Sequence, residues 1–138
     1  VLLPNVGREA HTYLHHICAH YDELAPLSVF AQGKPFDHAF DFHRTLRELR
    51  GDESFRWLGH LIDTDTHDGA RLFATWSKNT GVERLDMDSF HRALWGTVGP
   101  REYSFVLGGQ FVASRERIRA QPLEFWKRAL EISHTFPD

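Results

Sequence analysis

Residues 5–17 combine residue types that can bind or react with a polar ligand: an asparagine, a glycine turn, an Arg/Glu pair and several imidazoles. Arg8, at the start of an expected helix, can hold a phosphate or carboxylate together with the free backbone N–H groups there. Glu9 can act as a general base or accept a hydrogen bond from a sugar hydroxyl. The alternative is that Glu9 complements the helix dipole and Arg8 forms a surface ion pair. We favour the binding interpretation because both residues neighbour Gly7 and Asn5.

Four histidines follow on the same expected helix, at positions 11, 15, 16 and 20. Pairs separated by four residues suit two metal ligands on one helix, but at about 100° per residue the two pairs project to opposite sides of the apolar stripe. The chain also has no His-Glu-x-x-His pattern. We therefore interpret these histidines as surface or partly buried imidazoles, and keep His11 as a candidate substrate-binding residue.

Asp63 and Asp65 form an Asp-x-Asp pattern after an apolar run. With His67 or Asp68 they would suit Mg²⁺ or Mn²⁺, although nothing in the sequence requires a metal. An acidic, solvated loop with Asx turns before Gly69 is the simpler interpretation, because so short a pattern arises easily by chance.

Asp37 and His38 lie at the entrance to an expected helix over residues 36–51. Asp37 is a second candidate catalytic carboxylate, and His38 a candidate substrate-binding residue. Together with Asp41 they also form an alternative candidate metal site, but helix capping by Asp37 explains that residue more simply.

Hydrophobic spacing predicts alternating helices and strands. We expect strands near residues 27–31, 55–62, 103–107 and 111–113, and helices near 10–21, 36–51, 86–96, 114–118 and 122–130. Asp86 or Asp88, Ser114 and Pro122 are suited to begin the last three helices. Residues 70–77 are ambiguous. This alternation predicts an α/β layer architecture, a small single-domain sheet with flanking helices.

Glycines and glutamines follow two of the expected strands: Gln32 with Gly33, and Gly108 with Gly109 and Gln110. In open α/β sheets, ligands bind beyond the carboxyl ends of the strands. Glycine lets a ligand approach the backbone, and an amide both donates and accepts hydrogen bonds. These residues are therefore candidate binding residues, or else simple turn residues and caps.

The composition predicts one compact, soluble domain. The chain has 138 residues, 41% of them hydrophobic, with four Trp and eleven Phe, enough to bury about two thirds of the unfolded surface. A net charge of −3 argues against non-specific binding to nucleic acid, although the local strip Arg115, Arg117 and Arg119 can hold a phosphate. The single cysteine, Cys18, excludes an internal disulfide and lies on the apolar stripe of the first helix.

Several linked motifs resemble a known family. They are Leu-Pro-Asn-Val-Gly-Arg-Glu at 3–9 continuing through His16 and Ile17, Tyr-Asp at 21–22, Val-Phe-Ala-Gln-Gly at 29–33 and Pro-Phe-Asp-His at 35–38. Residues 105–118 and Pro-Leu-Glu-Phe-Trp at 122–126 fit its closing segment. Over nearly its whole length the chain resembles the domain of unknown function 3431 family. That family is in turn reminiscent of nucleotide-sugar glycosyltransferases with a GT-A-like, Rossmann-like fold.

The resemblance implies a cleft that binds a sugar or sugar nucleotide, lined by Asn5, Arg8, Glu9, Gln32, Asp37, His38 and Gln110. Glycosyl transfer would use Glu9 or Asp37 as the base. Two departures stand out: the N-terminal strand segment of longer members is missing before Asn5, and Ala31-Gln32-Gly33 stands where such enzymes usually carry Asp-x-Asp.

We therefore expect a domain over residues 1–138 that binds a sugar or nucleotide sugar and is glycosyltransferase-like if catalytic. The alternative is a non-catalytic carbohydrate-binding or homo-oligomerising protein, and a metal-dependent hydrolase ranks last. We expect no nucleic-acid partner and no membrane span, because no apolar run is long enough. A cytoplasmic location is favoured, with an N-terminus that looks incomplete because the only methionine is Met87.

Overall fold

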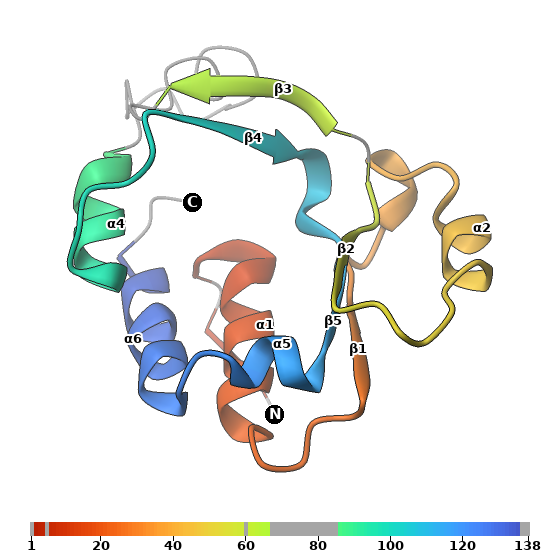
Figure 1. Ribbon diagram of the computed structural model, residues 1–138, viewed down its shortest axis with the longest axis horizontal. Coiled ribbons are helices and arrows are strands. Elements are labelled where there is room, and N and C mark those ends of the chain that lie inside the picture. The colour runs from red at the N-terminus through yellow and green to blue at the C-terminus, as the bar shows by residue number, and fades with distance from the viewer. Residues whose placement is uncertain (1, 5, 60, 67–85, 136–138) are drawn as a thin grey trace.

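A three-stranded antiparallel sheet lies between helices on its two faces in the computed structural model, which describes residues 2–4, 6–59, 61–66 and 86–135. The strand order is β1 (Leu27–Phe30), β5 (Phe111–Ser114), β2 (Phe55–Trp57), so the last strand in sequence is central. Helix α1 (Arg8–Ala19) covers one face and α2 (Phe42–Arg47) the other (Figure 1). The chain is thus a small mixed α/β domain.

The strand register determines which side chains share a face. Phe30 is opposite Phe111, which is opposite Trp57. Cross-strand neighbours point to the same side, and this row faces α1. There Phe30 joins the buried core with Ile17. The next row of β5 faces α2, where Val112 packs with three buried residues, Ala39, Phe42 and Leu58.

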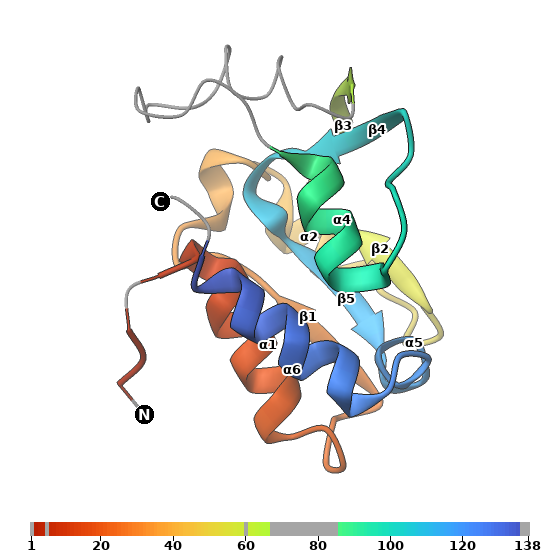
Figure 2. The same cartoon turned by 90° about the vertical axis from the view of Figure 1, so that its left-hand side faces the viewer.

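Three further helices extend the α1 side. Helix α6 (Leu123–Ser133) lies beside α1, and α4 (Met87–Trp95) packs on α6 (Figure 2). The short helix α5 (Arg115–Arg119) links β5 to α6. The α4–α6 contact has its own apolar cluster, made of Leu94, Phe125 and Ala129. The apolar stripes predicted for these helices are therefore core.

The expected N-termini of the last three helices are confirmed. Asp86 caps α4, accepting a hydrogen bond from the Ser89 N–H at 2.9 Å. Ser114 caps α5 by accepting from the Arg117 N–H at 3.0 Å. Pro122 immediately precedes the first residue of α6. Helix-capping preferences depend on a few neighbouring residues, so they can be predicted from the sequence without tertiary information.

The acidic segment after residue 61 is a strand, not the loop that we expected. β3 (Leu61–Thr66) pairs antiparallel with β4 (Glu102–Val106), placing Asp63 opposite Phe105 and Asp65 opposite Tyr103. The turn preference of aspartate is outweighed here by pairing with a β-rich segment that is distant in sequence. Residues 67–77, including the rest of the acidic motif and the ambiguous run, lie outside the described residues.

The continuous helix expected over residues 36–51 is also wrong. A 3₁₀ turn, η1 (Pro35–Asp37), comes first, and α2 begins only at Phe42. Between them the Ala39 N–H donates to Pro35 O and the Phe42 N–H to Ala39 O. This break lets Ala39 and Phe42 both pack against the sheet. Asp37 therefore ends a short turn and does not cap the helix, which begins after Asp41.

Candidate functional site

A polar cluster forms where β1 ends and β5 begins. Because the two strands run antiparallel with Phe30 opposite Phe111, Gln32 follows the end of β1 where Gly109 precedes the start of β5, and the two residues meet at this end of the strand pair. Glu9, in the first turn of α1, reaches the same end, and Gln32 Nε2 donates a hydrogen bond of 2.8 Å to Glu9 Oε1. A Cβ on Gly109 would lie 3.6 Å from Glu9 Oε1. We call these three residues the Glu9 cluster.

The Glu9 cluster offers complementary hydrogen-bonding groups. The bond between Glu9 and Gln32 uses one carboxylate oxygen and one amide proton, so further lone pairs, a second amide proton and the amide oxygen are left over. Both side chains are half-buried, which holds them in place while leaving them reachable. The sequence predicted both residues, Glu9 from its place at the start of a helix after a glycine turn and Gln32 from the assumption that carboxyl ends of strands meet. Antiparallel pairing of β1 with the start of β5 is what assembles the cluster.

Gln110 lies behind the cluster and is fully buried. Its Nε2 donates to Pro35 O at 2.9 Å, while its Oε1 is buried and has no hydrogen-bond partner within the part of the chain that the structure describes. Gly108 has φ +82°, and a Cβ there would collide with Gln110 Oε1 and lie 2.7 Å from His38 Cβ. Only glycine therefore allows His38 and Gln110 to pack around this turn.

Several other predicted site residues make no hydrogen bond to the Glu9 cluster within the described part of the chain, and others cannot be placed. Arg8 and Asp37 are exposed, as is Gly33, and among the described residues no side-chain hydrogen bond or ion pair joins them to Glu9. Arg8 has φ +50°, a left-handed conformation that costs a residue other than glycine about 1–2 kcal/mol. Asn5 lies outside the described residues, and so do the side chains of Asp63 and Asp65. Among the described residues no group of three or more His, Cys, Asp or Glu could hold a metal.

His11 is buried on the α6 side of α1, more deeply than expected. Its Nδ1 is 3.0 Å from Ser133 Oγ, and the Ser133 hydroxyl donates its only proton to Leu130 O at 2.6 Å. His11 Nδ1–H must therefore be the donor to Ser133, which excludes His11 as the base for that hydroxyl in this arrangement. Burial, followed by the nearby His134 and His15, lowers the pKa of His11. The pair joins two helices as a neutral contact.

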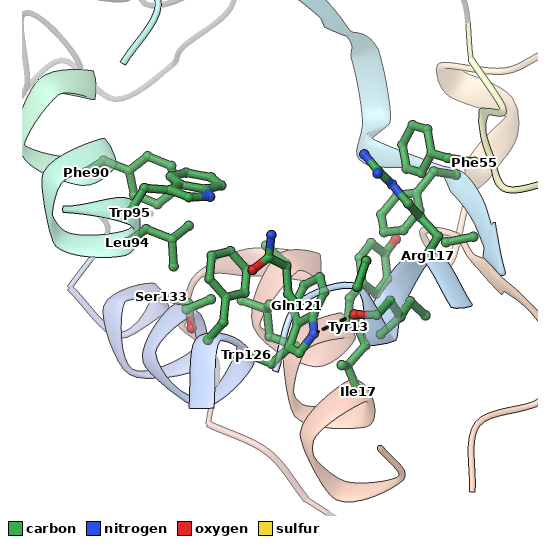
Figure 3. A pocket seen from close by; sticks show the side chains of 18 of the residues that line it. Tyr13, Ile17, Phe55, Phe90, Leu94, Trp95, Arg117, Gln121, Trp126 and Ser133 are labelled. Atoms are coloured by element: carbon green, nitrogen blue, oxygen red, sulfur yellow. Dashed lines mark hydrogen bonds between the residues drawn. The ribbon is translucent and has the colours of Figure 1, made fainter. Parts of the chain in front are cut away.

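A large apolar cavity of about 660 Å³ lies between the sheet and the helices. One wall carries Phe55, Trp57 and Phe111 of the sheet, and the other carries Phe90 and Trp95 of α4 (Figure 3). Phe55, Trp57 and Trp95 are each more than 40% exposed (42%, 47% and 47%) although their rings face this space. The volume is that of a typical small-molecule site.

Sequence reasoning missed this cavity. The aromatic residues were assigned individually to strands and helices, and the only available signal was that Phe55 and Trp57 alternate on a strand with a polar residue, Arg56, between them. That pattern shows a shared face but not whether the face is covered. The cavity is lined by β2 and β5 and by α4, which are far apart in the sequence, so it is a tertiary feature.

Tyr13 connects the cavity to the Glu9 cluster. It lines the cavity and lies one helical turn after Glu9, and its hydroxyl is buried without a hydrogen-bond partner among the described residues. Burial, reinforced by the negative charge of Glu9, raises the pKa of Tyr13 to about 12. The hydroxyl is therefore protonated at neutral pH and available as a donor.

The fold and cavity define a small mixed α/β domain with a ligand-sized cavity next to a polar cluster. The chain belongs to the family described as "Protein of unknown function (DUF3431)", whose model matches residues 2–135. No curated protein and no solved structure matches the chain. None of the helices in the described ranges has the length and apolar character needed to cross a membrane.

Proposed function

We propose that this protein binds a sugar or sugar nucleotide through the Glu9 cluster. The observation that carries the proposal is the 2.8 Å hydrogen bond between Gln32 Nε2 and Glu9 Oε1, held beside the bare backbone of Gly109. The carboxylate can accept a hydrogen bond from one hydroxyl, and the amide N–H beside it can donate to the neighbouring hydroxyl, which is the pattern that vicinal sugar hydroxyls require. A glycine at this position lets a ring approach without meeting a side chain.

The catalytic form of this proposal is glycosyl transfer. An acceptor hydroxyl oxygen bonds to the anomeric carbon, the bond from that carbon to the leaving phosphate breaks, and the hydroxyl proton goes to the Glu9 carboxylate. Asp37, exposed on η1, is the second candidate base. Mg²⁺ or Mn²⁺ at Asp63 and Asp65 would neutralise the leaving diphosphate. The alternative, a non-catalytic carbohydrate-binding domain, uses the same contacts at Glu9 and Gln32 without turnover.

The test is ligand-observed NMR of free sugars, nucleotides and nucleotide sugars, each with and without Mg²⁺ or Mn²⁺. Binding of a sugar that is lost in Glu9→Gln and in Gln32→Ala supports the proposal. Glu23→Gln is the matched control, because Glu23 is exposed and the change removes the same charge. Release of nucleotide by the wild type then separates transfer from binding alone. No saturable binding of any sugar, or equal binding in Glu9→Gln, would overturn the proposal.

A further inference from the structure

The cavity between β5 and α4 has a composition that suits an apolar ligand with a single polar end. Most of its lining is aromatic or aliphatic, and several of its polar atoms are already used. Trp126 Nε1 donates to Ile118 O at 3.0 Å, and Ser133 Oγ donates to Leu130 O. A nucleotide, with its ribose and phosphates, needs many more hydrogen-bonding partners than remain here. The cavity therefore favours a hydrocarbon body.

Arg117 supplies a charge at the edge of this cavity. The three arginines of α5 differ: Arg115 Nε donates to Leu24 O at 2.6 Å, and Arg119 Nε to Tyr21 O at 3.0 Å. The guanidinium of Arg117, at an exposed position, makes no hydrogen bond or ion pair with the described residues, and Arg117 lines the cavity together with Phe55 (Figure 3). An unpaired guanidinium beside apolar walls complements an anionic head group attached to an apolar chain.

We propose that this cavity binds a free aliphatic monocarboxylate, with its chain between the Phe55/Trp57 wall and the Trp95 wall and its carboxylate on Arg117. The volume of about 660 Å³ accommodates a chain of medium length. Enclosing the chain removes the exposed faces of three aromatic rings, Phe55, Trp57 and Trp95, from water, which drives binding. This inference does not rest on the proposed sugar site: Glu9 and Gln32 are not among the residues that line the cavity, although Tyr13 lies between the two.

The experiment uses three probes, dodecanoate, dodecanol and dodecyltrimethylammonium, which share the same alkyl chain and carry an anionic, a neutral and a cationic head group. Binding is followed by calorimetry and by tryptophan fluorescence, since Trp57, Trp95 and Trp126 all line the cavity. We expect dodecanoate to bind with one-to-one stoichiometry and the cationic probe to bind at least about tenfold more weakly. Arg117→Gln should weaken dodecanoate binding about two- to fivefold and leave dodecanol unchanged, as for an ion pair at a solvated site.

Two variants make the result decisive. Arg128→Gln removes the same charge from an exposed position of α6 outside the cavity lining, and should bind dodecanoate as the wild type does. Ala10→Phe fills the cavity from an exposed position of α1, so it should abolish binding without unfolding the protein. Equal affinity for all three probes, an Arg117→Gln variant indistinguishable from Arg128→Gln, or dimerisation that buries Trp95 in the absence of ligand would each overturn the proposal.

Discussion

A Cβ on Gly7 would lie 2.7 Å from the carbonyl oxygen of Ser133, so the backbone at the start of α1 touches the end of α6. Ser133 also receives the hydrogen bond from His11, one turn into α1. Two segments that are 122 residues apart are therefore joined by a glycine contact and a buried side-chain hydrogen bond. This junction fixes the orientation of the helix that carries Glu9 and Tyr13.

We expect Gly7→Ala to destabilise the fold by about 2–4 kcal/mol. The left-handed φ of +59° costs alanine about 1–2 kcal/mol, and the overlap with Ser133 O adds a similar amount. Urea unfolding gives the change in the free energy of unfolding. Gly96→Ala is the control, since φ is +76° there and nothing lies within 4 Å of a Cβ. Equal losses of stability in the two variants would mean that the contact between position 7 and Ser133 O adds nothing to the cost of the left-handed φ.

The buried histidine predicts a pH dependence of stability. Because burial lowers the pKa of His11, the unfolded state binds more protons than the folded state at acidic pH. Stability should therefore be complete above about pH 6.5 and fall as the pH drops through the lowered pKa. The melting temperature should depend less steeply on pH in His11→Gln than in the wild type. The pH dependence that remains is expected from His16, whose pKa is also lowered, mainly by burial. His43→Gln, at an exposed position, should keep the wild-type slope, and an unchanged slope in His11→Gln would contradict the assignment.

The two glutamines at the sheet edge should differ sharply in their effect on stability. Gln110→Ala removes one of the hydrogen bonds that Pro35 O accepts and opens a cavity in a fully buried site, so we expect a loss of about 2–4 kcal/mol. Gln32→Ala removes a half-buried hydrogen bond to Glu9 and should cost only about 0.5–1 kcal/mol. Chemical denaturation of both variants measures the difference. A Gln32 variant as unstable as the Gln110 variant would show that Gln32 is structural and is not a binding residue.

Cys18 should react slowly with disulfide reagents in the folded protein. Burial raises the pKa of the Cys18 thiol, and Lys127 opposes this shift. The thiolate is the reactive form, so the native protein at neutral pH should react at least about tenfold more slowly than the urea-unfolded chain. Lys127→Gln should slow the reaction further, whereas Lys34→Gln, on the loop after β1, should have no effect. Native labelling as fast as that of the unfolded chain would contradict burial of this thiol.

The sequence identified Glu9 and Gln32 as candidate binding residues, and the structure brings them into direct contact. The sequence placed Gly109 at the carboxyl end of a strand, whereas it precedes β5, which runs antiparallel to β1. The direction of β5 relative to β1 is not encoded in either segment alone. Asp37, grouped with Glu9 by sequence, stays on an exposed turn. Its role as a second base remains a prediction.

Local physical chemistry alone determined the cap at Ser114, a cap of α4 at Asp86 or Asp88, the apolar stripe of α1 and the positions of β1, β4 and β5. These features depend on spacing over a few residues. Only the tertiary structure decided that residues 61–66 form a strand, that His11 is buried against Ser133, and that the aromatic walls enclose a cavity beside Arg117. Each of these depends on contacts between segments far apart in the chain, whose packing outweighs local preference.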